Sequence, residues 1–129
     1  MVWADNGVQE DSTLGFADRE GFRCGTCFPF AVYDIVHDRP TDTLERPLIF
    51  MDVAARGRGL SNAEMLDSLN GLFERCLSVG GDMVVLWHNS NTVRDWTSCF
   101  QEVYTPFLRR ATTQLRDYER MEYDQQRTL

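Results

Sequence analysis

Lysine is absent from this 129-residue chain, and all 13 of its basic residues are arginines. Twenty acidic residues bring the formal net charge to −7, and no basic patch stands out. Because nucleic-acid affinity depends on the neutralisation of phosphates, this charge balance excludes nucleic acid as an expected partner. An acidic composition without lysine suits a high-salt cytoplasm or a GC-rich genome, and it carries no information about the fold.

Long apolar runs are also missing. No segment approaches the roughly 20 apolar residues of a membrane-spanning helix, and residues 1–6 lack the basic start and apolar stretch of a signal peptide. We therefore expect a cytoplasmic protein with no membrane contact. The length fits one domain, and 43% hydrophobic residues are enough for a packed core.

Histidine occurs only at positions 37 and 88, so the chain has no H-x-x-x-H pair of metal ligands. A G-x-S-x-G elbow is missing too, and Gly57, Arg58 and Gly59 lack the remainder of a phosphate-binding loop. We therefore predict no metal ligands within this chain. His37 lies in a polar stretch and is expected to be a solvated surface residue.

Four cysteines are present, and Cys24 and Cys27 form a C-x-x-C pair. A redox pair would be expected at the start of a helix, where the thiol pKa falls, and a zinc site would need two further ligands. The pair is followed by the segment 28–30, Phe-Pro-Phe, which is typical of a loop. The favoured interpretation is two small apolar loop residues, with a thiol module as the weaker alternative.

The middle of the chain predicts a strand, a helix and a second strand. Residues 47–53 and 83–87 are apolar runs typical of buried parallel strands. Between them, Ser61 and Glu64 form a capping box that starts a helix, and Gly80 lies at its end. The fold class is therefore α/β with a parallel βαβ unit and a right-handed crossover.

The flanking segments are less regular. A short helix is expected over residues 2–7, a strand over 8–16, and a long loop rich in aromatic residues over 17–40. After His88, an apolar stripe predicts one helix, and Thr105-Pro106 starts or kinks a second. The stripe consists of Trp96, Phe100, Val103 and Tyr104.

Two polar residues end the predicted parallel strands. Asp52 follows the apolar residues 48–51 of the first strand and His88 follows the second strand, and ligands of parallel sheets bind at this edge. A carboxylate beside an imidazole orients the ring and stabilises its protonated form, which suits a general acid. The alternatives are a histidine satisfied by a backbone carbonyl and an aspartate that forms a turn.

Five short segments then resemble a family. The segments 11–16, 21–26, 29–30, 47–52 and 86–90 occur in the order found in a bacterial and archaeal branch of polysaccharide deacetylase-like proteins. These proteins belong to the NodB-homology group, also called carbohydrate esterase family 4. The similarity covers about residues 3 to 110, which is most of the chain.

The resemblance implies a fold and an activity. Residues 1–112 would be the C-terminal part of a (β/α) barrel, and 113–129 would be a charged helical tail. The family hydrolyses acetyl groups of carbohydrates with a divalent metal, often zinc. By resemblance, His88 protonates the leaving amine, Asp52 tunes this histidine, and Arg23 faces the carbohydrate substrate.

The chain also departs from the family. The Asp-Asp motif and the paired histidines that hold the metal would lie before Met1, so no deacetylase activity is expected from this chain by itself. An incomplete barrel predicts self-association or a missing N-terminal half. The alternative is a non-catalytic, degenerate domain that binds a glycan or a protein through the aromatic residues of the segment 22–33.

Overall fold

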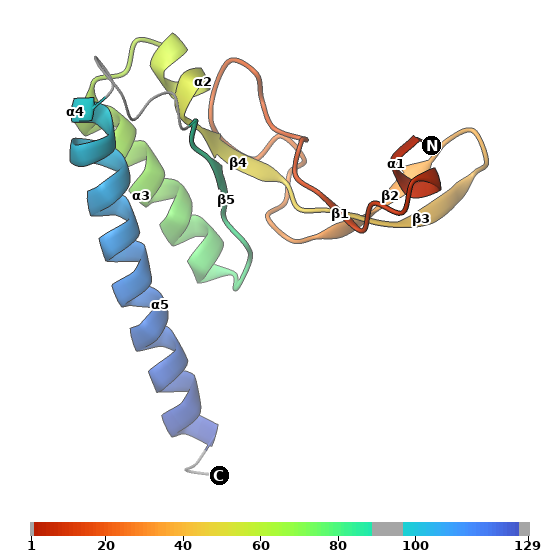
Figure 1. Cartoon of the computed structure of the whole chain (residues 1–129). Coiled ribbons are helices and arrows are strands. Elements are labelled where there is room, and N and C mark those ends of the chain that lie inside the picture. Colours follow the sequence, from red (N-terminus) through yellow and green to blue (C-terminus); the bar gives the residue numbers. More distant parts are fainter. Residues whose placement is uncertain (1, 89–96, 127–129) are drawn as a thin grey trace.

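The computed structural model describes residues 2–88 and 97–126. The elements in chain order are α1 (Val2–Asp5), β1 (Glu10–Asp11), β2 (Phe30–Asp34), β3 (Arg39–Glu45), β4 (Leu48–Met51), α2 (Asp52–Gly57), α3 (Asn62–Ser78), β5 (Val84–Leu86), α4 (Thr97–Cys99), the π-helix η3 (Phe100–Tyr104) and α5 (Thr105–Gln126). The helices α3 and α5 lie beside β4 and β5, whereas β2 and β3 form a hairpin that extends away from them (Figure 1).

The predicted βαβ unit is present. β4 and β5 pair in parallel, with Leu48 opposite Val84 and Met51 opposite Leu86. The crossover contains α3, which begins with the predicted capping box: the Ser61 hydroxyl accepts from the Glu64 N–H, and the Glu64 carboxylate accepts from the Ser61 N–H. Both bonds satisfy backbone donors at the helix start, so local sequence alone fixes where the crossover helix begins.

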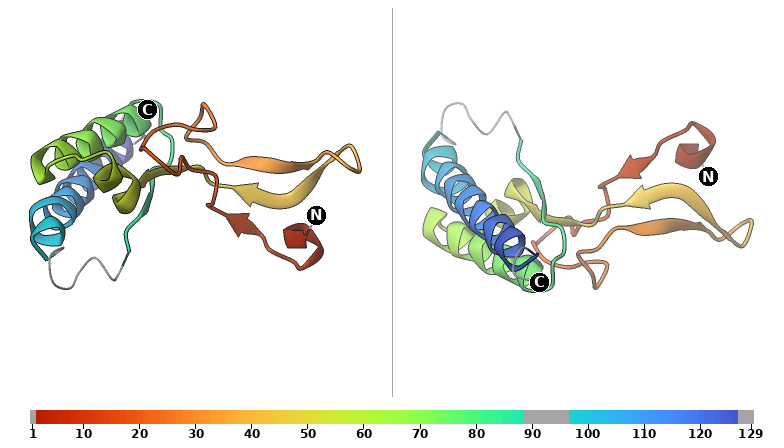
Figure 2. Two further views of the ribbon diagram at one scale, coloured as in Figure 1. Left: turned by 90° about the horizontal axis from the view of Figure 1, so that it is seen from above. Right: turned by 90° about the horizontal axis from the view of Figure 1, so that it is seen from below.

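The face of α3 that the sequence predicts to be apolar lies in the core. Its buried residues are Met65, Leu69, Leu72, Phe73 and Cys76. They pack in one cluster with β4 and with the C-terminal helices, where the rings of Phe73 and Phe107 meet edge to face at 5.9 Å. Figure 2 shows α3 and α5 together on one side of the β4–β5 pair.

The sequence predicts a strand over 47–53 and then a loop interrupted by glycines. This prediction is wrong for the end of the strand and for the start of the loop. β4 stops at Met51, and the residues from Asp52 to Gly57 form the helix α2. Two alanines, both buried, favour the helix, and an aspartate is favourable in a first helical turn. The glycines mark the end of this helix: the Gly59 N–H donates to the Arg56 carbonyl, and its φ of 81° is one that glycine adopts without strain.

The predicted loop over 17–40 is also wrong in its second half. Its last residues form β2 and the start of β3, and the sheet order is β1-β3-β2 with β1 parallel and β2 antiparallel to β3. Strand β3 escaped the prediction because its buried residues Thr43 and Glu45 are polar, so no apolar alternation marks it. Both bind the N-terminal segment: Thr43 donates to the Val8 carbonyl at 2.7 Å, and Glu45 accepts from the Leu14 N–H at 3.0 Å.

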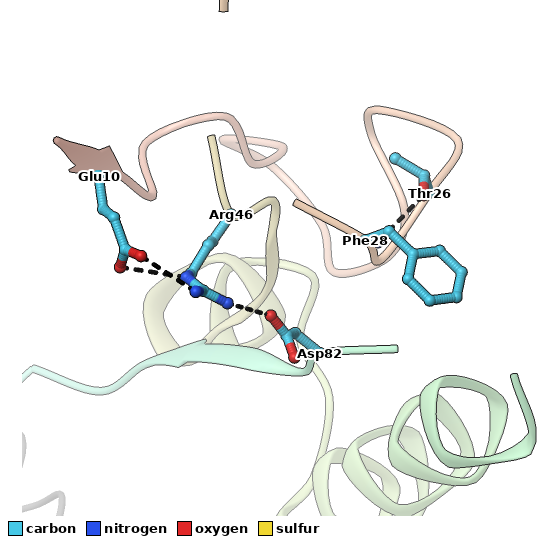
Figure 3. A network of polar contacts seen from close by, with 5 residues as sticks. All are labelled: Glu10, Thr26, Phe28, Arg46 and Asp82. Carbon is cyan, nitrogen blue, oxygen red and sulfur yellow. Dashed lines mark hydrogen bonds and ion pairs between the residues drawn. The ribbon is translucent and has the colours of Figure 1, made fainter. Parts of the chain in front are cut away.

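Arg46 joins the two sheets. Its guanidinium donates to both carboxylate oxygens of Glu10 at 3.1 and 3.0 Å, and on the other side to Asp82, which precedes β5 (Figure 3). The three side chains are between 36% and 53% exposed, so solvent screens both ion pairs and each adds little to stability. The bridge thus fixes geometry between the sheets more than it adds stability.

The C-terminal helices form one continuous run instead of two segments. The turn before Pro106 is the π-helix η3, followed directly by α5. Proline has no N–H for an α-helical bond and its ring crowds the preceding turn, which a wider π turn accommodates. α5 runs without a break past the predicted boundary at residue 112. Within the described ranges, no helix is long and apolar enough to cross a membrane.

All four cysteines are free thiols. Cys27 is 6% exposed and belongs to the core cluster, which confirms its interpretation as an apolar packing residue. Burial, together with the neighbouring Cys27, raises the pKa of the Cys76 thiol to about 12. A Cβ atom placed on Gly81 would overlap the Cys27 sulfur, so the Cys27 thiol can pack at this position only against a residue without a side chain.

Replacement of this glycine tests the packing. Gly81→Ala is expected to lower the free energy of unfolding by about 1–3 kcal/mol, because the new methyl group overpacks the core. Gly71→Ala, in α3 where a Cβ meets nothing within 4 Å, should instead raise it by about 0.5–1 kcal/mol. Urea unfolding measures both, and equal effects of the two substitutions would contradict the role given to Cys27.

Candidate functional site

Asp52 and His88 meet at the carboxyl ends of the two parallel strands. The register places Met51 opposite Leu86, so the residues that follow leave the sheet at one edge. The His88 ring nitrogen Nδ1 lies 2.6 Å from Asp52 Oδ1, and the His88 backbone N–H donates to Asp52 Oδ2 at 3.0 Å. The predicted meeting of these two side chains, which lie 36 positions apart, is confirmed.

Asp52 is fully buried, with no exposed surface. Burial of a carboxylate is unfavourable unless hydrogen bonds replace its hydration. Here the Val53 backbone N–H donates to Oδ1 at 2.8 Å, in addition to the two contacts with His88. The carboxylate is therefore held by the start of α2 on one side and by His88, two residues after β5, on the other. It is a fixed acceptor, which is what a residue that positions an imidazole requires.

The His88 ring connects this buried carboxylate to the surface. The histidine side chain is 39% exposed, whereas that of Asp52 is 0% exposed. An ionised carboxylate can only accept hydrogen bonds, so the proton in the short contact lies on Nδ1. The second ring nitrogen, Nε2, is then the atom that can exchange a proton with a bound molecule. This arrangement can donate or accept one proton.

A second Asp–His pair provides a comparison. The His37 Nδ1 lies 2.8 Å from Asp34 Oδ2, and this hydrogen bond holds the pKa of Asp34 down to about 2. The two residues are only three positions apart in a turn, and the His37 side chain is 61% exposed, as its predicted surface position requires. Contact alone therefore does not define a site; the position beyond two parallel strands sets Asp52 and His88 apart.

Arg23 lies in the exposed loop before β2. Its guanidinium donates to the Gly15 carbonyl at 2.8 Å, and the same loop is tied to β4 by the Gly21 N–H, which donates to the Ile49 carbonyl at 2.8 Å. The hydrogen bond from Arg23 to the Gly15 carbonyl therefore stabilises the backbone of the loop itself. Its substrate-facing role stays a prediction.

An aromatic cluster beside His88 was not expected from the sequence. Trp87 packs against Tyr104 and Phe100 of η3, with ring centroids 4.9 and 6.5 Å apart. Its indole N–H is buried without a hydrogen-bond partner among the described residues. The cluster fixes the end of β5 against the C-terminal helices. The sequence signal for this cluster was the apolar stripe. Trp96 of that stripe lies outside the described residues, and so do Asn89 and Ser90 of the segment 86–90.

The resemblance implies a divalent metal, and the described residues contain no set of ligands for it. Over 2–88 and 97–126, no three histidine, cysteine, aspartate or glutamate side chains lie close enough together to hold a metal ion. The residues of these two ranges therefore offer no ligand set for that metal.

The chain matches no protein-family model, no curated protein and no solved structure. The resemblance to polysaccharide deacetylase-like proteins, and with it the partial barrel, therefore stays a prediction. The structure shows mixed α/β content, with one three-stranded sheet and one parallel two-stranded sheet.

Replacement of Asp52 tests how tightly the site is built. Asp52→Asn is expected to lower the free energy of unfolding by about 2 kcal/mol or more, because charge-assisted bonds are lost and an amide hydrogen then faces buried N–H donors. Asp67→Asn, on the exposed side of α3, should change it by less than about 0.5 kcal/mol. Denaturant unfolding compares the two; an equally small effect at both positions would contradict the account of Asp52.

Proposed function

We propose that this chain is the C-terminal portion of a polysaccharide deacetylase-like hydrolase, in which His88 is the general acid and Asp52 positions it. One observation carries the proposal. A fully buried carboxylate lies 2.6 Å from a partly exposed imidazole, beyond the carboxyl ends of two parallel strands. The order of the five family-like segments supports the same assignment.

The proposed chemistry is protonation of a leaving group. When the carbon–nitrogen bond of an N-acetyl group breaks, the departing amine needs a proton, and a protonated His88 can supply it from Nε2. Such general acid catalysis contributes roughly 10²–10⁴-fold to a rate. A general acid does not supply the attacking nucleophile. The resemblance implies that the base and the residues that would hold a divalent metal belong to the other portion of the barrel. The chain alone is therefore expected to be inactive.

Arg23 is the proposed contact to the carbohydrate. A guanidinium carries five N–H donors, and the described hydrogen bond to the Gly15 carbonyl involves one of its nitrogens. The remaining donors suit the hydroxyl and carbonyl oxygens of a sugar. Because the loop is anchored to β4 through Gly21, it can hold the guanidinium in place.

A second candidate function rests on a hollow beside the same loop. A cavity of about 290 Å³ is lined in part by Phe22, Phe28 and Arg75. The Phe28 ring is 46% exposed and points away from the loop backbone (Figure 3). Exposed aromatic faces and an arginine also suit a non-catalytic glycan-binding domain, which would bind without turnover.

Reconstitution tests the proposed roles. The full chain is mixed with an N-terminal portion that carries an Asp-Asp motif and paired histidines, and with Zn²⁺, and acetate release from oligomers of N-acetylglucosamine is measured. His88→Asn is expected to lower the rate at least about 100-fold. His37→Asn, which alters the other Asp–His pair, should leave the rate unchanged.

The outcomes separate the two functions. An undiminished rate with His88→Asn would show that His88 is not the acid. Oligosaccharide binding without turnover, unaffected by a chelator and lost in Phe28→Ala, would favour the non-catalytic domain instead.

A further inference from the structure

A glutamate is buried in the middle strand of the three-stranded sheet. Glu45 ends β3 and has no exposed surface, although a glutamate is almost never fully buried without a partner. Its carboxyl oxygen Oε1 accepts from the Leu14 N–H at 3.0 Å. The other oxygen, Oε2, is buried and has no hydrogen-bond donor within the described ranges. A buried oxygen without a partner is unfavourable, so this one requires an explanation.

A second carboxyl group faces Glu45 from the neighbouring strand. β1 and β3 run parallel with Asp11 opposite Glu45, so both side chains leave the sheet on the same face. The Asp11 side chain lies within hydrogen-bonding reach of the Glu45 carboxyl group. Asp11 also has a donor of its own, because the Thr13 hydroxyl donates to its Oδ2 at 2.7 Å. The carboxyl group that lacks a donor is therefore the buried one.

Among the residues that the structure describes, no cation forms an ion pair with Glu45. Arg46, the next residue of the chain, points to the other face of the sheet and binds two carboxylates there (Figure 3). Arg23 donates to a backbone carbonyl, and the Cys24 thiol lies near Glu45. On β2, the residue opposite Glu45 is Phe30. The surroundings of this carboxyl group thus favour its neutral form.

A single proton explains this arrangement. Two ionised carboxylates can only accept hydrogen bonds, so contact between them is repulsive. A proton on Glu45 Oε2 donates to Asp11 and gives the buried oxygen its partner, while Oε1 still accepts from the Leu14 N–H. Burial raises the pKa of Glu45 above its usual range, and the neighbouring Asp11 adds to this rise against the opposing effect of the Leu14 N–H.

A bound cation is a poorer explanation of the same contact. Calcium takes roughly six to eight oxygen ligands, which is more than two carboxyl groups supply. Over 2–88 and 97–126, no group of three acidic, histidine or cysteine side chains is placed to hold a metal ion. A proton needs neither further ligands nor a cavity, so it fits a fully buried oxygen better.

The Glu45 carboxyl group fixes the start of the loop between β1 and β2. Its bond with the Leu14 N–H holds the segment 11–15 beside the end of β3. The Leu14 carbonyl contacts the Cys24 thiol at 3.8 Å, and the Gly15 carbonyl accepts from Arg23 at 2.8 Å. The protonation state of Glu45 is therefore connected, through this segment, to the part of the loop that carries Arg23.

We propose that Asp11 and Glu45 share one proton, and that this proton holds the segment 11–15 and the loop that carries Arg23 on the three-stranded sheet. Loss of the proton places two negative charges side by side and gives Glu45 a charge that burial disfavours. Glu45 then turns towards solvent, its bond with Leu14 breaks, and the loop loosens as the pH rises. This pH-sensitive contact does not depend on the proposed deacetylase chemistry.

The pH dependence of unfolding tests the proposal on the full chain. Because folding takes up the shared proton, the stability that the proton provides is complete at low pH and is lost as the pH rises through the raised pKa of Glu45. The equilibrium constant for unfolding, measured in urea, should therefore rise between about pH 5 and about pH 8, by up to roughly tenfold per pH unit.

Variants separate the shared proton from other titrating groups. Glu45→Gln keeps an acceptor for the Leu14 N–H and has a permanent N–H donor for Asp11, so its unfolding constant should rise less with pH than that of the wild type. Glu119→Gln, at an exposed position of α5, should keep the wild-type dependence. If Glu45→Gln does not fold, as judged by circular dichroism, Asp11→Asn replaces it. Its amide can donate to an ionised Glu45, so the pH dependence should move to lower pH.

Amide hydrogen exchange at Leu14, followed by NMR, reports on the contact itself. Its protection factor, which corrects for the intrinsic rise of exchange with pH, should fall as the pH rises in the wild type and stay constant in Glu45→Gln. The Met65 N–H, which donates to the Ser61 carbonyl at 2.9 Å, is the control for opening of the whole fold.

Three results would overturn the proposal: equal pH dependence of unfolding in the wild type and Glu45→Gln, constant protection of Leu14 in the wild type, or a Glu45 carboxyl group that carbon-13 NMR shows to be fully ionised at about pH 5. The effect of millimolar Ca²⁺ on unfolding is measured in parallel at about pH 8. Stabilisation of the wild type by Ca²⁺, lost in Glu45→Gln, would identify the pair as a cation site and equally overturn the proposal.

Discussion

The parallel pairing of β4 with β5 is the constraint on which the site depends. Because Met51 lies opposite Leu86, the next residues of both strands emerge at one edge, and a buried carboxylate meets an imidazole that lies 36 positions further along the chain. A register shifted by one residue would turn the side chains of a strand to the other face and separate the two. The crossover helix α3, with its own cap and apolar face, secures this register from the core side.

The carboxylate in turn holds the parts of the site together. Asp52 starts α2, accepts from the Val53 N–H, and binds both the backbone and the ring of His88. A buried charge that loses its partners is strongly destabilising, so this contact links local stability to the orientation of the ring. In the proposed function the same residues serve packing and chemistry, so a substitution that changes one is expected to change the other.

Part of this arrangement could be predicted from the sequence. Three features are local signals: the capping box, the two apolar strands, and the polar residues that end these strands. Because the carboxyl ends of parallel strands lie at one edge of a sheet, these signals predict that Asp52 and His88 lie close together. Strand β3 escaped because Thr43 and Glu45 are polar and buried, and α2 escaped because its glycines suggested a loop. Thr43 and Glu45 of β3 are bound by the Val8 carbonyl and the Leu14 N–H. These hydrogen bonds join segments more than 30 residues apart, so they leave no local pattern in the sequence.

The state of the His88 ring is the most direct test of the account, because a general acid positioned by Asp52 must carry its proton on a defined nitrogen. Nitrogen-15 NMR of the ring in the full chain distinguishes the two forms. The account predicts that neutral His88 is protonated on Nδ1, towards Asp52, and that Nε2 carries no proton in this form. A neutral ring protonated on Nε2, with Nδ1 bare beside the carboxylate, would contradict it.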